Sequence, residues 1–381
     1  MLRPIDVKTF DDYAQKIFLP FVEKQLRIAV RVDIVWDEYI EDSLKSQTRS
    51  ERGKGIRRRV NGANKLPGNW QSFLRIDENK TDLFSFLAEY AITVNTEKLV
   101  VSTHGKNVLC NRIKDTDDLA PCSHEEADTR IFVHMADAVK EGLRSILIRT
   151  VDTDVVVLAI AAVARLQTVT ELWIAFGTGT NFRYIPVHSI AAALGTDKSL
   201  ALPMFHAFSG CDTVSSFATI GKKTAWDTWK TFSDVTATFL ALSRPPPFID
   251  EDHIKVLERF TILMYERTSS CCSIDEARMA LFTKRNRTMF TIPPTRGALL
   301  QHAKRAVYQG GHTWGQLFAT NHVLPCPSDW GWTDAPNWKP LWTTLPEASI
   351  ASRQLVRCGC QKSCKGNCTC KKAALLCTAL C

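Results

Sequence analysis

Carboxylates that follow strands or begin helices are the residues of this sequence whose types and spacing could do chemistry. In parallel α/β sheets, ligands bind beyond the carboxyl ends of the strands. Asp152 and Asp154 directly follow the apolar run "SILIRT" at residues 145–150, which places them at such an end. The full set of candidates is Asp37, Glu126, Asp128, Asp152, Asp154 and Asp212, with Glu125 as an additional one.

Clustered carboxylates need cations, because like charges at close range raise one another's pKa and resist burial. Oxygen ligands suit Mg²⁺ or Mn²⁺. Two such ions, about 3.5–4 Å apart, are the usual machinery for in-line displacement at phosphorus. Taken singly, each acid has a structural alternative: Asp152 could cap a helix, and Glu125 and Glu126 could favour a helix N-terminus through its dipole. Taken together, the acids favour a site for two metal ions.

Alternating strands and helices must position these acids. Short apolar, β-branched runs predict strands, and apolar residues at helical spacing predict helices. The predicted strands are residues 29–36, 97–103, 145–150, 171–177 and 181–187. The predicted helices are residues 80–91, opened by Thr81, and 125–142, then a helix or strand-helix after Asp152 and a short helix at 188–195. This alternation predicts an α/β fold with a parallel sheet flanked by helices.

The pattern changes along the chain. From about residue 197 it becomes helical, and residues 301–350 are rich in proline and tryptophan. We predict a core over residues 1–237 that includes a helix-turn-helix at about 205–235, a helical extension over 238–300, an irregular strap over 301–350 and a cysteine-rich tail over 351–381.

The composition is that of a globular protein, with 45% hydrophobic and 23% charged residues in a chain of 381. The net charge of +8 is a modest bias toward an anionic partner. The longest apolar run, "VVVLAIAAVA", is shorter than the roughly 18 residues of a membrane helix. Since no secretory signal opens the sequence, we expect a soluble, intracellular protein without a membrane partner.

Seven of the thirteen cysteines crowd the last part of the sequence: Cys358, Cys360, Cys364, Cys368, Cys370, Cys377 and Cys381. In a chain without a secretion signal, clustered cysteines indicate metal rather than disulfides. Zn²⁺ offsets the repulsion of such dense thiolates, and it takes four ligands. Seven cysteines therefore form two zinc sites only if one sulfur bridges. The alternative is a metal-storage or incidental cysteine-rich tail.

Two basic segments are candidates for contacts with nucleic acid. In "IGKKTAW", Gly221 would let backbone N–H groups approach a phosphate, while Lys222 and Lys223 would supply charge. The alternative for this segment is an ordinary helix-turn-helix packing unit with exposed lysines. An earlier stretch could line a channel for single-stranded nucleic acid, or form a solvated loop. That stretch, residues 44–60, contains Lys45, Arg49, Arg52, Lys54, Arg57, Arg58 and Arg59.

Four motifs, in this order along the chain, resemble those of the flap endonuclease branch of the PIN-like nucleases. They are "DIVWDEYIEDSLKSQTRSERGKG", "SHEEADTRI", "TVDTDVVVL" and "FSGCDTVSSFATIGKKTAW", and they cover roughly residues 30–235. The resemblance implies a PIN-like sheet, metal-dependent hydrolysis of DNA, and metal-binding roles for the acids Asp37, Glu126, Asp128, Asp152, Asp154 and Asp212. The family's earlier first-strand aspartate has no counterpart here, since Asp6, Asp11 and Asp12 lie in helical-looking sequence.

The cysteine spacing resembles the CXC motif of tesmin/TSO1-type DNA-binding proteins. This resemblance implies a zinc-stabilised tail that adds DNA affinity, with interleaved lysines suited to phosphate. A nuclease joined to such a module hints at a mobile-element origin, and DNA as the partner implies the nucleus. Two classes of function stay open: a structure-specific nuclease, acting on duplexes and single-strand junctions, and a catalytically inactive DNA-binding or regulatory protein on a degenerate nuclease fold.

Overall fold

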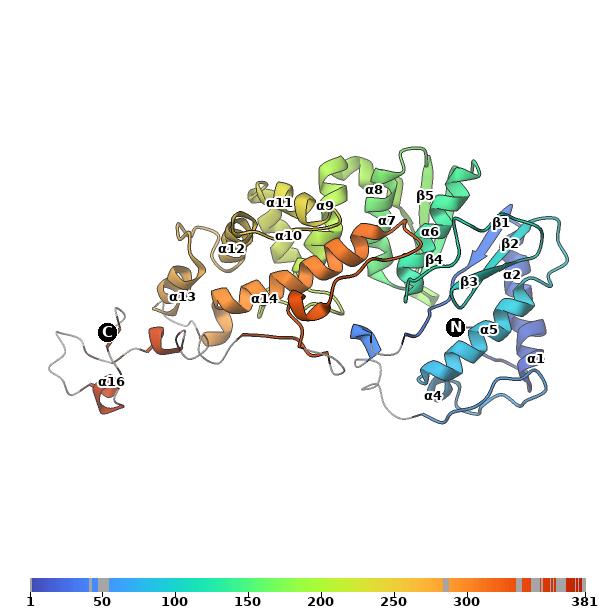
Figure 1. Ribbon diagram of the computed structural model, residues 1–381, viewed down its shortest axis with the longest axis horizontal. Helices are drawn as coiled ribbons and strands as arrows, with labels where there is room; N and C mark the ends of the chain where they lie inside the picture. Colours follow the sequence, from blue (N-terminus) through green and yellow to red (C-terminus); the bar gives the residue numbers. More distant parts are fainter. Residues whose placement is uncertain are drawn as a thin grey trace. The chain divides into compact units, whose positions relative to one another are not determined.

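The computed structural model describes most of the chain, with gaps that concentrate in the tail. It describes residues 2–40, 43–46, 55–283, 288–333, 338–343, 350, 352–356, 358, 360, 368–373, 375, 377 and 378. The chain divides into two compact units. The first contains Met1–Ile190 and Gln316–Val323, and the second contains Ala191–Gly315 and Leu324–Cys381. Figure 1 labels most of the helices and strands of both.

The first unit contains a three-stranded mixed sheet near its N-terminus. Strand β1 (Arg31–Ile34) pairs in parallel with β2 (Leu99–His104), and β2 pairs in antiparallel fashion with β3 (Asn107–Cys110). The β2–β3 hairpin was not predicted from the sequence. The helices that precede or separate these strands are α1 (Phe10–Tyr13), the π-helix η1 (Ala14–Phe18), α2 (Leu19–Leu26), α4 (Trp70–Phe73) and α5 (Asp77–Ala91).

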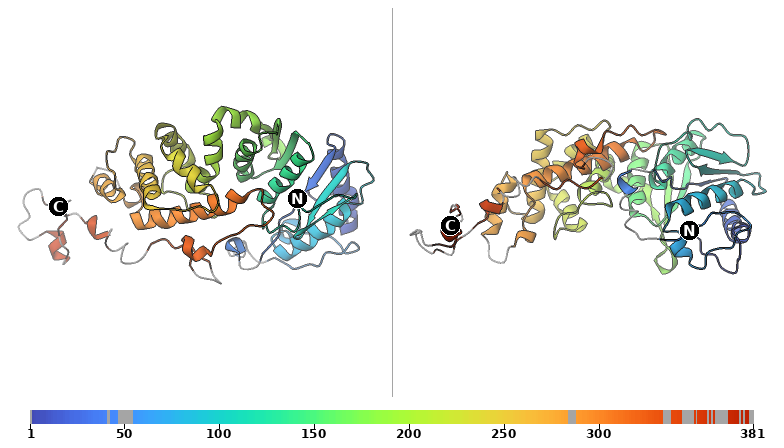
Figure 2. Two further views of the ribbon diagram at one scale, coloured as in Figure 1. Left: turned by 45° about the horizontal axis from the view of Figure 1, so that its top comes forward. Right: turned by 60° about the horizontal axis from the view of Figure 1, so that its bottom comes forward.

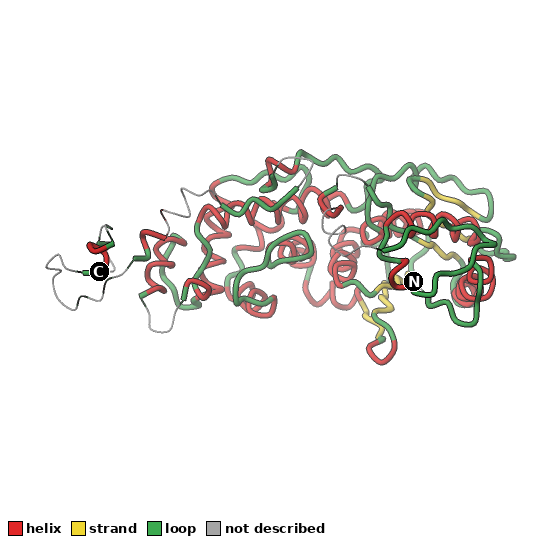
Figure 3. Tube along the Cα trace, turned by 90° about the horizontal axis from the view of Figure 1, so that it is seen from below, coloured by secondary structure: helices red, strands yellow, loops and turns green. Residues whose placement is uncertain are grey.

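A second three-stranded mixed sheet follows in the same unit. Strand β4 (Ser145–Thr150) pairs in parallel with β5 (Glu171–Phe176), and β5 pairs in antiparallel fashion with β6 (Arg183–Pro186). The helices around it are α6 (Ala127–Lys140), α7 (Thr153–Arg165), the short 3₁₀ turn η2 (Gly179–Asn181) and α8 (Val187–Leu194). A mixed α/β architecture is therefore confirmed, with the named strands divided between two small mixed sheets (Figure 3).

A buried ion network ties β1 to α6. The Arg31 guanidinium, with 3% of its side chain exposed, contacts the carboxylates of Asp33 at 2.8 Å and Asp137 at 2.6 Å. His134 of α6 lies 2.8 Å from Asp33 Oδ1, which also accepts a bond from the Arg31 guanidinium. Because buried charges are costly unless they are paired, this network fixes the orientation of β1 against α6. It thereby positions the segment that follows β1, which carries Asp37.

The second unit is helical over its described residues. Its longer helices are α9 (Thr196–Phe208), α10 (Lys222–Thr231), α11 (Val235–Leu242), α12 (Glu251–Tyr265), α13 (Ile274–Phe282) and α14 (Arg296–Val307). Its core is aromatic: Phe205 stacks on Trp229 with ring centroids 4.7 Å apart, and Phe239 packs edge-on against Phe260. Helix α14 packs along α9 and α12, as both views in Figure 2 show.

The predicted irregular strap begins later than expected. Helix α14 and the π-helix η4 (Tyr308–Thr313) occupy the first part of residues 301–350, and the 3₁₀ turns η5 (Trp314–Gln316) and η6 (Pro327–Trp330) follow. Gly311 explains the tight packing of η4, because a Cβ there would lie 2.3 Å from the Leu242 carbonyl oxygen. Within the part of the chain that the structure describes, no helix has the length and apolarity needed to cross a membrane.

Candidate functional site

The N-terminus of α6 brings the first two acidic segments together. Glu126 is the N-cap residue of α6, but its side chain makes no capping hydrogen bond. The Asp37 carboxylate does this instead, because its Oδ1 accepts a hydrogen bond of 2.9 Å from the backbone N–H of Ala127. The acid after β1 is thus fixed beside the acids that begin α6, and Asp128 lies in the first turn of that helix.

The third acidic segment lies where β4 ends and α7 begins. Asp152 is the N-cap of α7, and its Oδ1 accepts a hydrogen bond of 2.8 Å from the backbone N–H of Asp154. The capping role that the sequence allowed for Asp152 is therefore confirmed. Asp154 lies in the first turn of α7 and is partly buried.

Electrostatics link these segments into one acidic cluster, formed by Asp37, Glu126, Asp128 and Asp152. Burial, and then the charges of Asp152, Glu126 and Asp37, raise the pKa of the Asp128 carboxyl to about 8. Burial also raises the pKa of Glu126, against the opposing effect of Lys45. Burial and neighbouring negative charges both force the Asp128 carboxyl toward its neutral form at pH 7, and a cation would stabilise its charged form.

One cation of the chain already enters this cluster. The Lys45 ammonium forms an ion pair with Glu126, and both side chains are about three-quarters buried. In the same short segment, the Ser43 hydroxyl donates a hydrogen bond of 2.7 Å to the carboxylate of Glu125. The backbone of Glu125 accepts a further bond from the Glu38 N–H. The start of the predicted basic stretch is thus attached to the acids.

The remaining basic candidates of that stretch have other surroundings than Lys45. Arg57 pairs with Asp82 at 2.8 Å and donates to the Asn79 side chain, which also accepts a bond from the backbone N–H of Arg58. Arg49 and Arg52 lie outside the described residues. The channel for single-stranded nucleic acid stays a prediction.

Asp212 and the glycine-lysine motif belong to the second unit. Asp212 is exposed in the turn that follows α9. Gly221 is the N-cap of α10, and a side chain at this position would meet no atom within 4 Å. The open space around Gly221 is consistent with close approach of a ligand to the backbone.

The two lysines of this motif have different surroundings. The Lys222 ammonium donates hydrogen bonds of 3.0 Å to the His206 carbonyl and to the Ser209 hydroxyl, and it also bonds the Gly210 carbonyl. It therefore stabilises the carboxyl end of α9, where a positive charge is favourable. Lys223 pairs with Asp227 one turn further along α10, and 89% of its side chain is exposed. Of the two, Lys223 is better placed for solvent-side contacts.

Four cysteines of the tail form a candidate metal centre. The sulfur atoms of Cys358, Cys368, Cys370 and Cys377 all lie within 4.8 Å of one another, and the first three residues are buried. The Cys368 and Cys377 sulfurs are 3.7 Å apart. A tetrahedral Zn²⁺ with bonds of about 2.3 Å places its sulfur ligands roughly 3.8 Å apart, so the donor set fits zinc.

The structure describes one of the other three tail cysteines. Cys360 packs against the buried cysteines, while Cys364 and Cys381 lie outside the described residues. The short helix α16 (Thr369–Lys372) carries two lysines beside the cysteines, and the Cys368 sulfur accepts a bond from the Lys371 N–H. A second, bridged zinc site stays a prediction.

The acidic cluster is looser than the cysteine centre. Over the described ranges, the four cysteines are the only group of three or more potential ligands whose ligand atoms lie within 4.8 Å of one another. Sequence reasoning included Lys45 only as one of several basic residues. Its place in the acidic cluster depends on a fold of the chain that local sequence patterns do not reveal.

Comparisons with protein-family models, with curated proteins and with solved structures found no match to this chain.

Proposed function

We propose that this protein is a metal-dependent nuclease that hydrolyses phosphodiester bonds of DNA. The observation that carries the proposal is the convergence of acids from three separate segments on Asp128. The segment after β1 supplies Asp37, the start of α6 supplies Glu126 and Asp128, and the start of α7 supplies Asp152. Burial, and then the charges of these neighbouring acids, raise the pKa of the Asp128 carboxyl, and divalent cations would stabilise its charged form.

The donor set of the acidic cluster fits Mg²⁺ or Mn²⁺, because it consists of carboxylate oxygens with surplus negative charge. Asp37, Asp128 and Asp152 would hold the ions, with Glu126 and Asp154 beside them. Two such ions supply an activated water and stabilise the leaving oxygen in phosphodiester hydrolysis. Asp37 and Asp152 meanwhile cap α6 and α7, so they hold both helix N-termini at the site.

The finer features of the proposal concern the fold and the partner. The acid-bearing sheets would correspond to a PIN-like core, and the motif around Asp212 and Gly221 would grip duplex backbone. The cysteine centre would hold Zn²⁺ in a CXC-type tail that adds DNA affinity. A DNA substrate would place the protein in the nucleus.

A cleavage assay tests the nuclease proposal. Purified protein with Mg²⁺ or Mn²⁺ is incubated with labelled flap, hairpin and duplex DNA. Asp128→Asn and Asp152→Asn should abolish cutting, and both should fold: the first removes repulsion, and the second keeps a good helix cap. Asp117→Asn, which removes an exposed carboxylate of the same unit, is the matched control and should cut normally.

The second candidate function is a DNA-binding or regulatory protein that cuts nothing. The looseness of the acidic cluster favours it, since the carboxylate oxygens do not form a group as tight as the cysteine centre. Under this alternative, the chain binds the same DNA with or without metal, and Asp128→Asn leaves binding unchanged. Absence of cutting on every substrate would replace the nuclease proposal with this one.

A further inference from the structure

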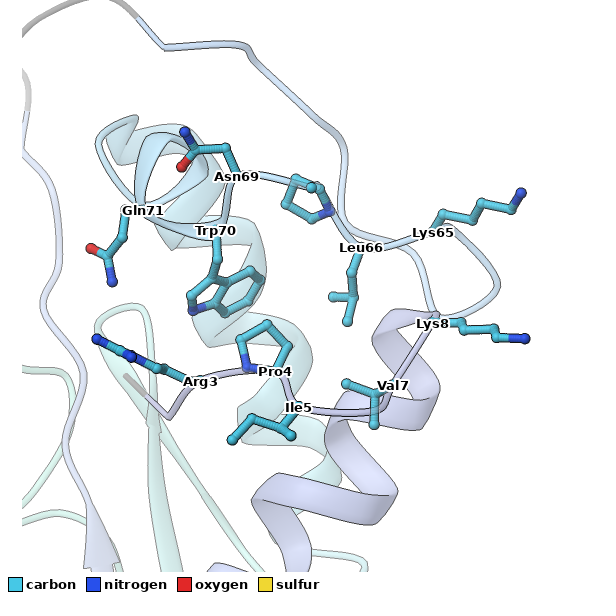
Figure 4. Close-up of a pocket in the computed structure, with 12 residues that line it drawn as sticks. Arg3, Pro4, Ile5, Val7, Lys8, Lys65, Leu66, Asn69, Trp70 and Gln71 are labelled. Carbon is cyan, nitrogen blue, oxygen red and sulfur yellow. The ribbon is translucent and has the colours of Figure 1, made fainter.

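A pocket in the first unit lies away from the residues discussed so far. It has a volume of about 910 Å³ and lies between the N-terminal segment and the chain that leads into α4 (Figure 4). The segment around Arg3–Lys8 forms one wall, and residues 65–71 form the other. The two walls are held together by backbone bonds, because the Leu66 N–H donates to the Lys8 carbonyl.

The charged residues that line this pocket are all basic. Its lining includes Arg3, Lys8 and Lys65, and it includes no acidic residue. Asp12, which follows this wall, accepts bonds from the Lys8 and Thr9 N–H groups and pairs with Lys16, while the exposed Asp6 is not among the lining residues. Anionic ligands are therefore favoured over neutral or cationic ones.

Trp70 supplies an independent indication that the pocket binds a ligand. The residue is 7% exposed, and its ring packs against Tyr13 and Phe73. Its indole N–H is buried and has no hydrogen-bond partner. Figure 4 shows this nitrogen facing the space between the side chains of Arg3 and Gln71. Since a buried donor without an acceptor costs free energy, an acceptor placed there would be favoured.

The middle of the pocket is apolar. Pro4, Val7 and Leu66 line it, and in Figure 4 they lie between the Arg3–Gln71 end and the end from which Lys8 and Lys65 extend. Donors at one end and cations at the other thus flank an apolar surface. This alternation matches a nucleic-acid strand, in which charged phosphates flank flat bases whose edges carry acceptors.

We propose that this pocket binds single-stranded nucleic acid. One base would lie on the apolar surface of Pro4 and Leu66, with an acceptor directed at the Trp70 indole N–H. The flanking phosphates would contact Arg3 at one end and Lys8 with Lys65 at the other. The inference goes beyond the proposed nuclease, because it needs neither the acidic cluster nor a metal ion.

Gly68 offers a clean test of the pocket. It lines the pocket, and a Cβ at this position would meet no atom within 4 Å, so a side chain can be added without a clash. Gly68→Glu adds a negative charge, and Gly68→Gln adds the same bulk without charge. Binding of a labelled four-nucleotide deoxythymidine strand is measured by fluorescence anisotropy in EDTA, which prevents metal-dependent cutting. We expect Gly68→Glu to weaken binding at least fivefold and Gly68→Gln to change it less than twofold.

A second measurement locates the strand. A strand with 5-iodouracil is irradiated on the full chain, and the cross-linked tryptic peptide is identified by mass spectrometry. The inference requires the adduct on residues 66–75, which contain Trp70, and its loss in Gly68→Glu. Equal affinities of the two Gly68 variants, an adduct elsewhere, or full displacement of the strand by polyglutamate would overturn it. Because strand binding is measured in EDTA, it does not depend on cutting, and a failure of the nuclease proposal is distinguishable from a failure of this inference.

Discussion

The ammonium of Lys45 forms an ion pair with the carboxylate of Glu126 inside the acidic cluster. Lys45 also opposes the rise in the pKa of Asp128, so its charge acts on more than one acid. A lysine in this place fills the role that a divalent cation would take at the site. In the proposed nuclease, metal binding at the cluster would therefore compete with a charge that belongs to the chain itself.

Lys45→Met should raise the affinity of the cluster for Mn²⁺. A partly exposed ion pair is worth roughly 1 kcal/mol, so we expect a decrease in Kd of about threefold to tenfold. Titration calorimetry of the variant and the parent at the same pH measures the change. Lys45→Arg keeps the charge and should leave the Kd within twofold. Weaker binding by Lys45→Met would mean that the lysine assists metal binding instead of opposing it.

Gly221 permits a test of the proposed duplex contact. Gly221→Asp and Gly221→Asn both place a good N-cap residue at the start of α10, in space that no other atom occupies. Both variants should therefore fold at least as stably as the parent. Only the aspartate would repel a phosphate, so we expect its affinity for duplex DNA to be at least fivefold below that of the asparagine variant, by anisotropy at fixed salt. Equal affinities would exclude the α10 N-terminus from DNA binding.

The burial of His302 predicts that the folded protein loses stability in acid. It is buried in the second unit, where its Nε2 donates to the Phe208 carbonyl and its Nδ1 accepts from the Ser215 hydroxyl at 2.9 Å. Burial, with a contribution from the Arg305 charge, lowers the pKa of His302 to about 4. The unfolded state therefore binds the extra proton first, and stability falls as the pH drops from about 6.5 toward 4.

The expected size of this effect is about 2 kcal/mol of unfolding free energy between pH 7 and pH 5. His302→Asn should reduce the difference between the two pH values by that amount, although it lowers stability at both. Urea unfolding of the full chain at each pH measures it. An unchanged difference would show that the histidine is charged in the folded protein, or that its region unfolds separately.

Cys370→Ser should remove one zinc equivalent from the tail. Cys370 is 1% exposed and is one of the four cysteines whose sulfurs lie together. We expect the zinc content of the purified chain, measured by mass spectrometry of the metal, to fall by one per chain. Cys272→Ser, which changes an exposed cysteine outside the tail, should keep the parental content. An unchanged content in Cys370→Ser would remove this cysteine from the zinc site.

Local signals in the sequence predicted the elements around the second sheet well. The strand at residues 145–150 and the capping role of Asp152 are both found, because each depends on neighbours in sequence. The predicted start of helix α5 was wrong. Thr81 resembles an N-cap, but the helix begins at Asp77, and the Thr81 hydroxyl bonds the Asp77 carbonyl within it.

Contacts between segments that are distant in the sequence account for the features that the sequence did not predict. Buried Asn79 accepts a bond from the backbone N–H of Arg58 and donates to the Ile56 carbonyl, so it fixes the basic stretch to α5. The contacts of Lys45 with the acids and of Lys222 with the end of α9 are likewise non-local. Their energies depend on tertiary packing, which periodicity and composition do not encode.

The first unit is completed by a segment from far along the chain. Residues Gln316–Val323 belong to it, and there the His322 N–H donates to the Ser123 hydroxyl while His124 contacts the Ala319 carbonyl. A gene fragment that ends at residue 190 would encode both sheets and the acidic cluster, yet leave Ser123 and His124 without these partners. A recombination event that transfers the complete first unit must therefore also transfer the helices of Ala191–Gly315, which lie between its two segments. We expect the two units to be inherited together.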